Sequence, residues 1–458
     1  MKRFNIYSCL LNRDAVISTV WSVLQQLVVA ASTYLIVKSI QMVTAGDLQQ
    51  GIQYISAFVI SLVLVYLPNT LSMAYLQRWR LSSIEKFVNS FIDHNKGRTT
   101  WGHARNKVTK ESWLTNESFA VFDGATGLLY QLISTLLNSL FNIMVIAWAL
   151  DSRIMGWYAA AGAILVGVNY LSRGFISKSS LAMQDSRNAL SSSMLSAWQN
   201  IFIGNRFNFE NWHQLFSERF RQSRKAAASY DITRSVISSI TVCVALLIVA
   251  LGNGIFLWEN QQNIPAIAAL FITMPRQLQI IQSIFSFFNL TLSWNGVRNQ
   301  LKTLEETLLS NSGTKDSLSY VQIPELSLTE RKNEIPLSTA DFFFKNIQDS
   351  AKGRRTLRGP NGAGKSTLLS VLKEKTGDSS FMLPTNYEDL SFSIDFLDHS
   401  DGNRLLAVFQ KIEKLDSVKY IILDEWDANL DGKNLSLIND AIERLAETKV
   451  IIESRHRG

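Results

Sequence analysis

The chain has 458 residues and a formal net charge of +7, and its charges are unevenly distributed. Residues 1–300 carry 24 Lys and Arg against 13 Asp and Glu, whereas residues 301–458 carry 21 against 25. The basic residues of the first part flank apolar stretches and form no stripe with interleaved aromatic residues, which argues against a nucleic-acid-binding protein. The two cysteines, Cys9 and Cys243, suggest neither a disulfide nor a metal site.

Six apolar stretches in the first part are long enough to cross a lipid bilayer as helices. The first is not a signal peptide, because it is long, lacks a small-residue cleavage site and precedes five more. Most basic residues lie in the N-terminal arm, the two long loops and the segment after the last stretch, so the positive-inside rule places both termini in the cytoplasm. The expected spans are Val16–Val37, Tyr54–Leu76, Leu128–Leu150, Ile154–Leu171, Ser235–Trp258 and Ile264–Leu292.

Two loops between the spans, residues 77–127 and 172–234, are too long to be simple connections. Large apolar residues recur at helical spacing in both, for example Trp79, Ile84 and Phe87 in the first loop. We therefore expect spans two to five to continue into the cytoplasm as long helices. The alternative is that these segments lie as amphipathic helices on the lipid surface.

The sixth expected span contains a proline followed by an arginine, Pro275 and Arg276. Proline kinks a helix and frees a carbonyl group, and an arginine inside a membrane usually faces a watery cavity or a partner. One interpretation makes Arg276 a cation of the substrate pathway, which favours an anionic or carboxylate-bearing cargo. The others are structural pairing with polar groups of a neighbouring span, or a span that begins after Arg276.

A glycine-rich stretch in the second part fits the pattern G-x-x-x-x-G-K-[ST], which is typical of a loop that holds nucleotide phosphates. Its glycines let the backbone turn its N–H groups towards an anion, and the following helix adds its dipole. Lys365 can reach the β- and γ-phosphates, and Ser366 can supply a hydroxyl to Mg²⁺. The candidate nucleotide-binding residues are Gly359, Pro360, Asn361, Gly362, Ala363, Gly364, Lys365, Ser366 and Thr367.

Further along, Lys419–Glu425 is an apolar strand that ends in two acids, Asp424 and Glu425. Asp424 would lie at the carboxyl end of the strand, where α/β sheets bind ligands and where it can hold Mg²⁺ through the water shell. Glu425 can polarise an attacking water. A last strand, Lys449–Ile452, leads to His456. Two acids at this distance after a phosphate loop, with a histidine after the next strand, favour a nucleotide hydrolase.

These segments resemble the ATP-binding cassette family of transporters. Gly359–Thr367 matches its Walker A motif, Ile421–Glu425 its Walker B motif with the catalytic glutamate, and Ala428–Asp431 its D-loop. His456 matches its switch histidine, so the resemblance implies catalytic roles for Glu425 and His456. The six spans with two long loops resemble the family's exporter-type membrane domain. The implied architecture is a six-helix all-α transmembrane domain, a linker and a P-loop α/β cassette, over residues 1–308, 309–318 and 319–458.

The cassette departs from the family pattern at several positions. The family's signature motif contacts the γ-phosphate of the other subunit, and the nearest stretch here keeps Ser400 and Gly402 but has Asp401 between them. A carboxylate near a phosphate weakens a closed dimer unless it is paired or turned away. Thr385 replaces the glutamine that couples the family's site to its membrane domain. Tyr320 is one candidate for the aromatic residue that stacks on adenine.

The sequence therefore predicts a multi-pass protein of the bacterial inner (cell) membrane that uses ATP and Mg²⁺ to export a peptide-like or amphipathic substrate. The half-transporter would act as a dimer, either with a second copy or with a different cassette protein that supplies an intact signature motif. The alternative is an ion-gradient-driven peptide transporter, or a receptor or immunity protein, whose cassette binds nucleotide without hydrolysing it. The joint presence of five residues favours the ATPase: Lys365, Ser366, Asp424, Glu425 and His456.

Overall fold

A computed structural model of the chain describes residues 5–99, 111, 113–309, 318–330, 333–385, 390–391, 401–427 and 432–455. The chain forms two compact units, of which the first comprises Met1–Phe87 with Ser118–Thr303 and the second comprises Val88–Glu117 with Leu304–Gly458. The second unit therefore includes part of the first long loop, which the expected boundary at residue 308 assigned to the membrane domain.

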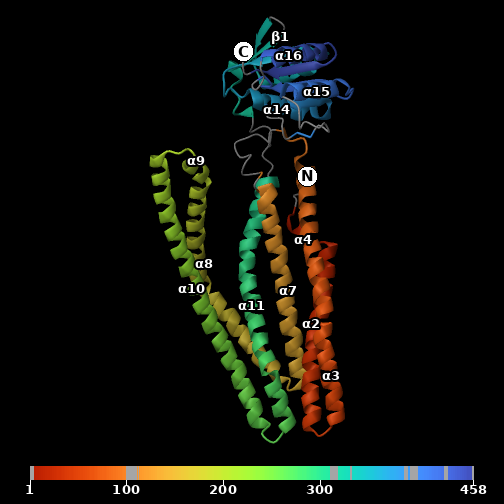
Figure 1. Ribbon diagram of the computed structural model, residues 1–458, viewed down its shortest axis with the longest axis vertical. Coiled ribbons are helices and arrows are strands. Elements are labelled where there is room, and N and C mark those ends of the chain that lie inside the picture. The colour runs from red at the N-terminus through yellow and green to blue at the C-terminus, as the bar shows by residue number, and fades with distance from the viewer. Residues whose placement is uncertain are drawn as a thin grey trace. The chain divides into compact units, whose positions relative to one another are not determined.

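The first unit is built of helices, and the described residues include six helical segments that are long and apolar enough to cross a membrane. Each of the six expected spans falls on one of these segments, so the prediction of six membrane-length helices is confirmed. The helices are α1 (Tyr7–Leu10), α2 (Arg13–Thr44), α3 (Leu48–Leu64), α4 (Tyr66–Asn95), α7 (Ser118–Ala149), α8 (Arg153–Leu195), α9 (Ala197–Phe202), α10 (Arg206–Glu259) and α11 (Ile264–Leu309) (Figure 1). The last residues of α4 and α11 belong to the second unit.

Proline and glycine positions explain two details of this unit. Pro68 lacks an N–H for the carbonyl of Leu64, and the second membrane-length segment is accordingly divided there into α3 and α4.

α8 and α10 run side by side as a long hairpin (Figure 1). At Gly252 of α10, an added Cβ would lie 2.5 Å from the Trp157 ring of α8, so the absence of a side chain permits the close packing.

One apolar core of the first unit lies where α7, α8, α10 and α11 meet. On α8 it uses Ile154, Tyr158, Ala161 and Leu165, which recur every three or four residues and therefore share one helix face. Most described residues of the long-loop segments are helical, because α4, α7, α8 and α10 all extend beyond the expected spans. The expectation of long helices in these loops is confirmed, and their continuation into the cytoplasm stays a prediction.

The second unit contains a six-stranded mixed sheet with the strand order β2-β1-β3-β6-β5-β4. β1 pairs antiparallel with both β2 and β3, whereas the four strands from β3 to β4 in this order pair parallel. The carboxyl ends of β3, β5 and β6 therefore meet at one edge. The strands are β1 (Ser327–Glu330), β2 (Asn333–Pro336), β3 (Gly353–Arg358), β4 (Ser380–Leu383), β5 (Tyr420–Asp424) and β6 (Val450–Ser454), with single turns η1 (Trp113–Glu117), η2 (Ile323–Glu325) and η3 (Gly377–Ser379) elsewhere in the unit.

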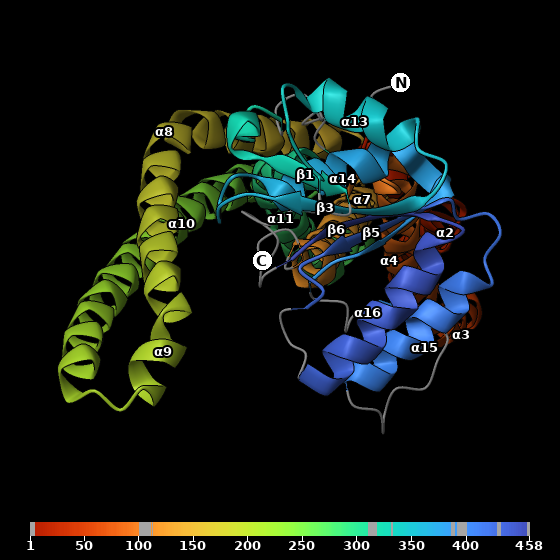
Figure 2. The same cartoon turned by 90° about the horizontal axis from the view of Figure 1, so that it is seen from above.

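Helices cover the sheet on both faces. α13 (Ala340–Gln348) and α14 (Lys365–Thr376) lie on one face, and α15 (Asp401–Glu413) and α16 (Gly432–Ala446) lie on the other (Figure 2). The two faces carry separate apolar cores, one with Phe343 and Leu368 and the other with Phe409 and Ile442. Every residue of β5 and β6 is buried, which positions their carboxyl ends firmly.

Candidate functional site

The glycine-rich loop joins β3 to α14 at the carboxyl edge of the parallel strands. Gly362 and Gly364 have φ angles of +86° and +95°, which residues with a side chain rarely adopt. Lys365 is only 8% exposed, and its Nζ donates hydrogen bonds to the carbonyl oxygens of Gly359 at 2.7 Å and Pro360 at 3.4 Å. The loop therefore folds around a buried ammonium group.

The segment that precedes β1 braces this loop. The backbone N–H of Gln322 donates to the carbonyl oxygen of Ala363 at 3.0 Å. Val321 lies against Gly364, and its neighbour Tyr320 is 75% exposed. Tyr320 is thus an exposed aromatic residue next in sequence to a contact that holds the loop, and its role in stacking on adenine stays a prediction.

The structure brings Ser366 and Asp424 together, as the two sequence motifs predict. Ser366 Oγ donates to Asp424 Oδ1 at 3.0 Å, and Ser454 Oγ at the end of β6 donates to the same oxygen at 2.7 Å. Asp424 is 3% exposed. The contact follows from the strand order, because β6 lies between β3 and β5 and all three strands end at the same edge.

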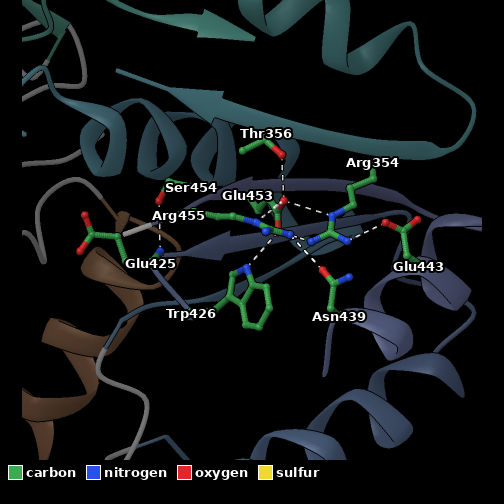
Figure 3. Close-up of polar contacts among 9 residues, drawn as sticks. All are labelled: Arg354, Thr356, Glu425, Trp426, Asn439, Glu443, Glu453, Ser454 and Arg455. Carbon is green, nitrogen blue, oxygen red and sulfur yellow. Dashed lines mark hydrogen bonds and ion pairs between the residues drawn. The ribbon is translucent and has the colours of Figure 1, made fainter. Parts of the chain in front are cut away.

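Glu425 has a strained backbone with a φ of +46°. No other non-glycine residue of the described segments has a positive φ. Its N–H donates to the carbonyl oxygen and to Oγ of Ser454, both at 3.1 Å, which holds this conformation. Strain of this kind costs about 1–3 kcal/mol and persists only where the surroundings enforce it, often at active sites. In Figure 3 the carboxylate of Glu425 points away from the neighbouring polar cluster.

The structure describes some of the other candidate residues and leaves others outside the described ranges. Thr385, the substitute for the family's glutamine, donates its hydroxyl to the carbonyl oxygen of Asp424 at 3.2 Å. Gly402 lies in the first turn of α15, which begins at Asp401. Ser400 and His456 fall outside the described residues, as does the D-loop stretch 428–431.

A buried ionic cluster beside Glu425 was not anticipated from the sequence; we call it the Glu453 cluster. Glu453 of β6 is fully buried and accepts hydrogen bonds on both carboxylate oxygens. Arg354 of β3 binds it through two nitrogens at 2.8 and 3.1 Å, and Arg455 Nε binds it at 3.0 Å. The cluster comprises Glu453, Arg354, Arg455, Thr356 and Trp426, and it reaches Glu443 and Asn439 of α16 (Figure 3).

The cluster shifts the acidity of its central groups. Burial alone would raise the pKa of Glu453, but the hydrogen bonds and charge of Arg354, with the charge of Arg455, outweigh burial and hold the pKa below its usual value. Burial likewise opposes the charge of Arg354, but the pairing with Glu453 and Glu443 raises its pKa. Both groups therefore stay ionised at neutral pH. Trp426, held by Glu453 at 2.9 Å, is the residue after Glu425.

The residues at this edge suit a magnesium–nucleotide complex. A hydroxyl and a carboxylate, Ser366 and Asp424, are the hard oxygen donors that Mg²⁺ prefers alongside waters and phosphates. No group of three or more His, Cys, Asp or Glu that could hold a metal occurs among the described residues. A cavity of about 1050 Å³ borders the loop at Gly359, Asn361 and Lys365, but it extends along β3, α16 and the Glu453 cluster, and its lining does not include Ser366 or Asp424.

Replacement of Gly364 by alanine is expected to disrupt this loop more than the same change at Gly362. Both positions have positive φ, but a Cβ at Gly364 would lie 3.0 Å from the backbone of Val321, whereas a Cβ at Gly362 meets nothing within 4 Å. Overpacking of this kind costs about 1–3 kcal/mol. Thermal unfolding of the full-length variants measures the difference. Equal stability of the two variants would contradict the assigned bracing role of Val321.

Arg276 lies in the first unit, on α11. Its Nε donates to Thr33 Oγ1 at 3.0 Å and its Nη1 to Gln279 Oε1 at 2.6 Å. A weaker contact joins Nη2 to the carbonyl oxygen of Val29 at 3.5 Å. Two of these acceptors, Thr33 and Val29, belong to α2. Arg276 therefore pairs with polar groups of a neighbouring span, which is one of the interpretations given by the sequence.

Comparison with known proteins adds no assignment. No family model matches this chain, and no curated protein matches its sequence.

Proposed function

We propose that this protein is an ATP-driven transmembrane transporter that acts as a dimer of cassette half-transporters and exports a peptide-like or amphipathic substrate. The observation that carries the proposal is the convergence of Lys365, Ser366, Asp424 and Glu425 at one edge of a sheet, in a chain with six membrane-length helices. A nucleotide-binding site and a membrane domain in one chain are the parts that such a transporter needs.

The proposal gives each of these residues a role. Lys365 exchanges its loop carbonyl partners for the β- and γ-phosphates, while the loop N–H groups and the α14 N-terminus bind the same anion. Ser366 and Asp424 would hold Mg²⁺, which would neutralise phosphate charge when bound. Glu425, turned outward by its backbone, orients and deprotonates the attacking water. Two cassettes would close over two ATP molecules, and the long helices would transmit the closure.

A hydrogen bond within the second unit supports coupling between this site and the membrane helices. Residues 88–117, which follow the apolar part of α4, belong to the same compact unit as the sheet. Thr99 Oγ1 from this segment donates to the carbonyl oxygen of Ser370 at 3.1 Å. Ser370 lies on α14, the helix that begins at the phosphate loop. Movement of α14 on nucleotide binding would therefore reach the chain that leads to the second and third membrane helices.

Substitution of Lys365 by alanine is expected to weaken ATP binding by about tenfold or more, because a hydrogen bond to a charged group contributes about 1.5–3 kcal/mol. ATP binding and ATP-dependent substrate transport are measured with the purified chain in lipid vesicles. Lys345→Ala, at an exposed position of α13, is the matched control and should leave both unchanged. Transport in Lys365→Ala vesicles at the wild-type rate would refute ATP as the energy source.

One observation favours a second candidate, a gradient-driven transporter or receptor-type protein with a regulatory cassette. The side chain of Thr385 is short, and its hydroxyl donates to the Asp424 carbonyl oxygen. It therefore does not extend as far towards a membrane domain as the glutamine found in the resembled family. A regulatory cassette does not need a long coupling side chain at this position. Transport that survives Lys365→Ala but stops with a proton uncoupler would select this candidate.

A further inference from the structure

In the membrane-helix unit, Arg276 makes no ion pair with an acid among the described residues. The three acceptors of Arg276 are a hydroxyl, an amide and a backbone carbonyl, all of them neutral. Thr33 in turn donates to Asn142 Oδ1 at 2.9 Å, so the hydrogen-bond network behind the guanidinium is neutral as well. Charged groups in an apolar bundle require a counter-charge or water.

The surrounding helices supply no counter-ion. Within the first unit, α2, α3, α7 and α11 contain only two acids, Asp14 and Asp123. Asp123 is paired with Arg80 at 2.9 Å, and Asp14 accepts a hydrogen bond from Ser82. Both acids also lie far along their helices from Arg276. For example, Thr135 lines the same cavity as Arg276, and the twelve residues from Asp123 to Thr135 correspond to about 18 Å at the α-helical rise. These helices therefore leave the charge of Arg276 to water or to an anion from outside this part of the chain.

A cavity of about 290 Å³ has Arg276 in its lining, together with residues of α2, α3 and α7. The lining is mixed: its polar residues include Gln25, Gln26, Ser134, Asn138 and Gln279, and its apolar residues are Val28, Val29, Leu62 and Val65. This volume is at the small end of the range for small-molecule sites, about 300–1,000 Å³. A small cavity with one cation and several neutral polar side chains fits a small anionic group.

A second feature concerns what accompanies the anion. Gln25 borders the cavity, and its Oε1 is buried without a hydrogen-bond donor among the described residues. If this side chain turns its oxygen towards the cavity, a ligand that carries an N–H group beside a carboxylate satisfies both Gln25 and Arg276. The carboxyl end of a peptide has this combination.

We propose that the Arg276 cavity binds the carboxylate of a peptide-like ligand, with Arg276 pairing with the carboxylate and Gln25, once its side chain turns towards the cavity, accepting the neighbouring amide N–H on Oε1. Arg276 suits this role because its planar fork can bind a carboxylate with two parallel hydrogen bonds, whereas neutral amides bind more weakly. The inference deepens the proposed transport function by naming the substrate class, and it depends on that function for its physiological meaning. The binding itself does not require ATP.

The test compares two probes that differ only at the carboxyl group. Binding of N-acetyl-leucine and of N-acetyl-leucinamide to the full chain in phosphatidylcholine nanodiscs is measured by calorimetry without nucleotide, with empty discs as the blank. We expect saturable binding of the acid and at least tenfold weaker binding of the amide. Equal affinity for the two probes, or no saturable binding of the acid, would overturn the proposal even without a variant.

Variants locate the site. Arg276→Gln should lose the preference for the acid, and Arg276→Lys should retain part of it because the charge remains without the fork. Arg298→Gln, at an exposed position of the same helix, is the matched control and should behave like wild type. Unchanged acid binding in Arg276→Gln would overturn the assignment.

An anionic lipid headgroup is the other source of the same charge. In nanodiscs that contain phosphatidylglycerol, the expected affinity for N-acetyl-leucine is unchanged. If the lipid instead competes with the acid and copurifies with wild type but not with Arg276→Gln, the peptide carboxylate is the wrong ligand. A chain that binds the acid without hydrolysing ATP would contradict only the proposed function, and an active ATPase that binds acid and amide equally would contradict only this inference.

Discussion

Glu425→Gln is expected to reduce ATP hydrolysis by about 100- to 10,000-fold, the usual contribution of a positioned general base, while ATP binding is retained. Glutamine keeps the size of the side chain and the two backbone hydrogen bonds to Ser454, so the strained turn can persist. What is lost is the carboxylate that, in the proposed function, accepts the proton of the attacking water. The phosphate loop and the Ser366–Asp424 contact are separate from this change.

The measurement is ATPase activity of the purified chain in lipid, with nucleotide binding determined on the same preparation. Glu413→Gln, at the exposed end of α15, removes an acid from the same unit and should leave the rate unchanged. Substantial residual hydrolysis in Glu425→Gln would show that another group activates the water. Loss of binding together with hydrolysis would indicate that the turn at Glu425 had rearranged.

The residues of the candidate site that the sequence predicted are those with strong local signals. Gly359–Thr367 has a fixed spacing of glycines and lysine, and Asp424 follows an uninterrupted apolar strand, so both could be placed without knowledge of the sheet. Their contact through Ser366 also follows, because parallel strands share a carboxyl edge. The membrane-length helices were predictable for the same reason, since hydropathy and length are local properties.

The Glu453 cluster could not be predicted, because its partners are distant in the sequence. Arg354 and Glu453 are 99 positions apart, and they meet only because β6 inserts between β3 and β5. The available signal was an acid inside a short strand of buried apolar residues, which requires a buried partner but does not identify it. The assignment of residues 88–117 to the second unit likewise depends on tertiary contacts.

Glu453→Ala is expected to destabilise the second unit by about 3–5 kcal/mol, the usual effect of removing one partner of a buried ion pair. Arg354 is itself mostly buried, with 11% of its side chain exposed, so it would lose its main counter-charge without gaining water. Trp426 would lose the acceptor of its indole N–H, which is also buried. Denaturant unfolding of the full-length protein measures the change.

Glu443→Gln is the matched control, because Glu443 pairs with the same arginine from the solvent side and is 60% exposed. Exposed pairs contribute about 0–1 kcal/mol, so this variant should remain close to wild type. Similar losses in the two variants would contradict the view that burial makes Glu453 decisive. ATPase activity of Glu453→Ala below its unfolding midpoint tests whether the cluster also holds the turn at Glu425.

The pH dependence of stability gives an independent test of the same cluster. The pKa of Glu453 is lowered in the folded protein, since Arg354 and Arg455 outweigh the effect of burial. A lowered folded-state pKa means that the unfolded chain binds the proton more readily, so the ionised carboxylate stabilises the fold above the ordinary glutamate pKa. This contribution is lost as the pH falls through the folded-state pKa. The stability difference between wild type and Glu453→Gln should therefore be largest near neutral pH and shrink on acidification; a difference that is constant with pH would show that Glu453 acts through packing rather than charge.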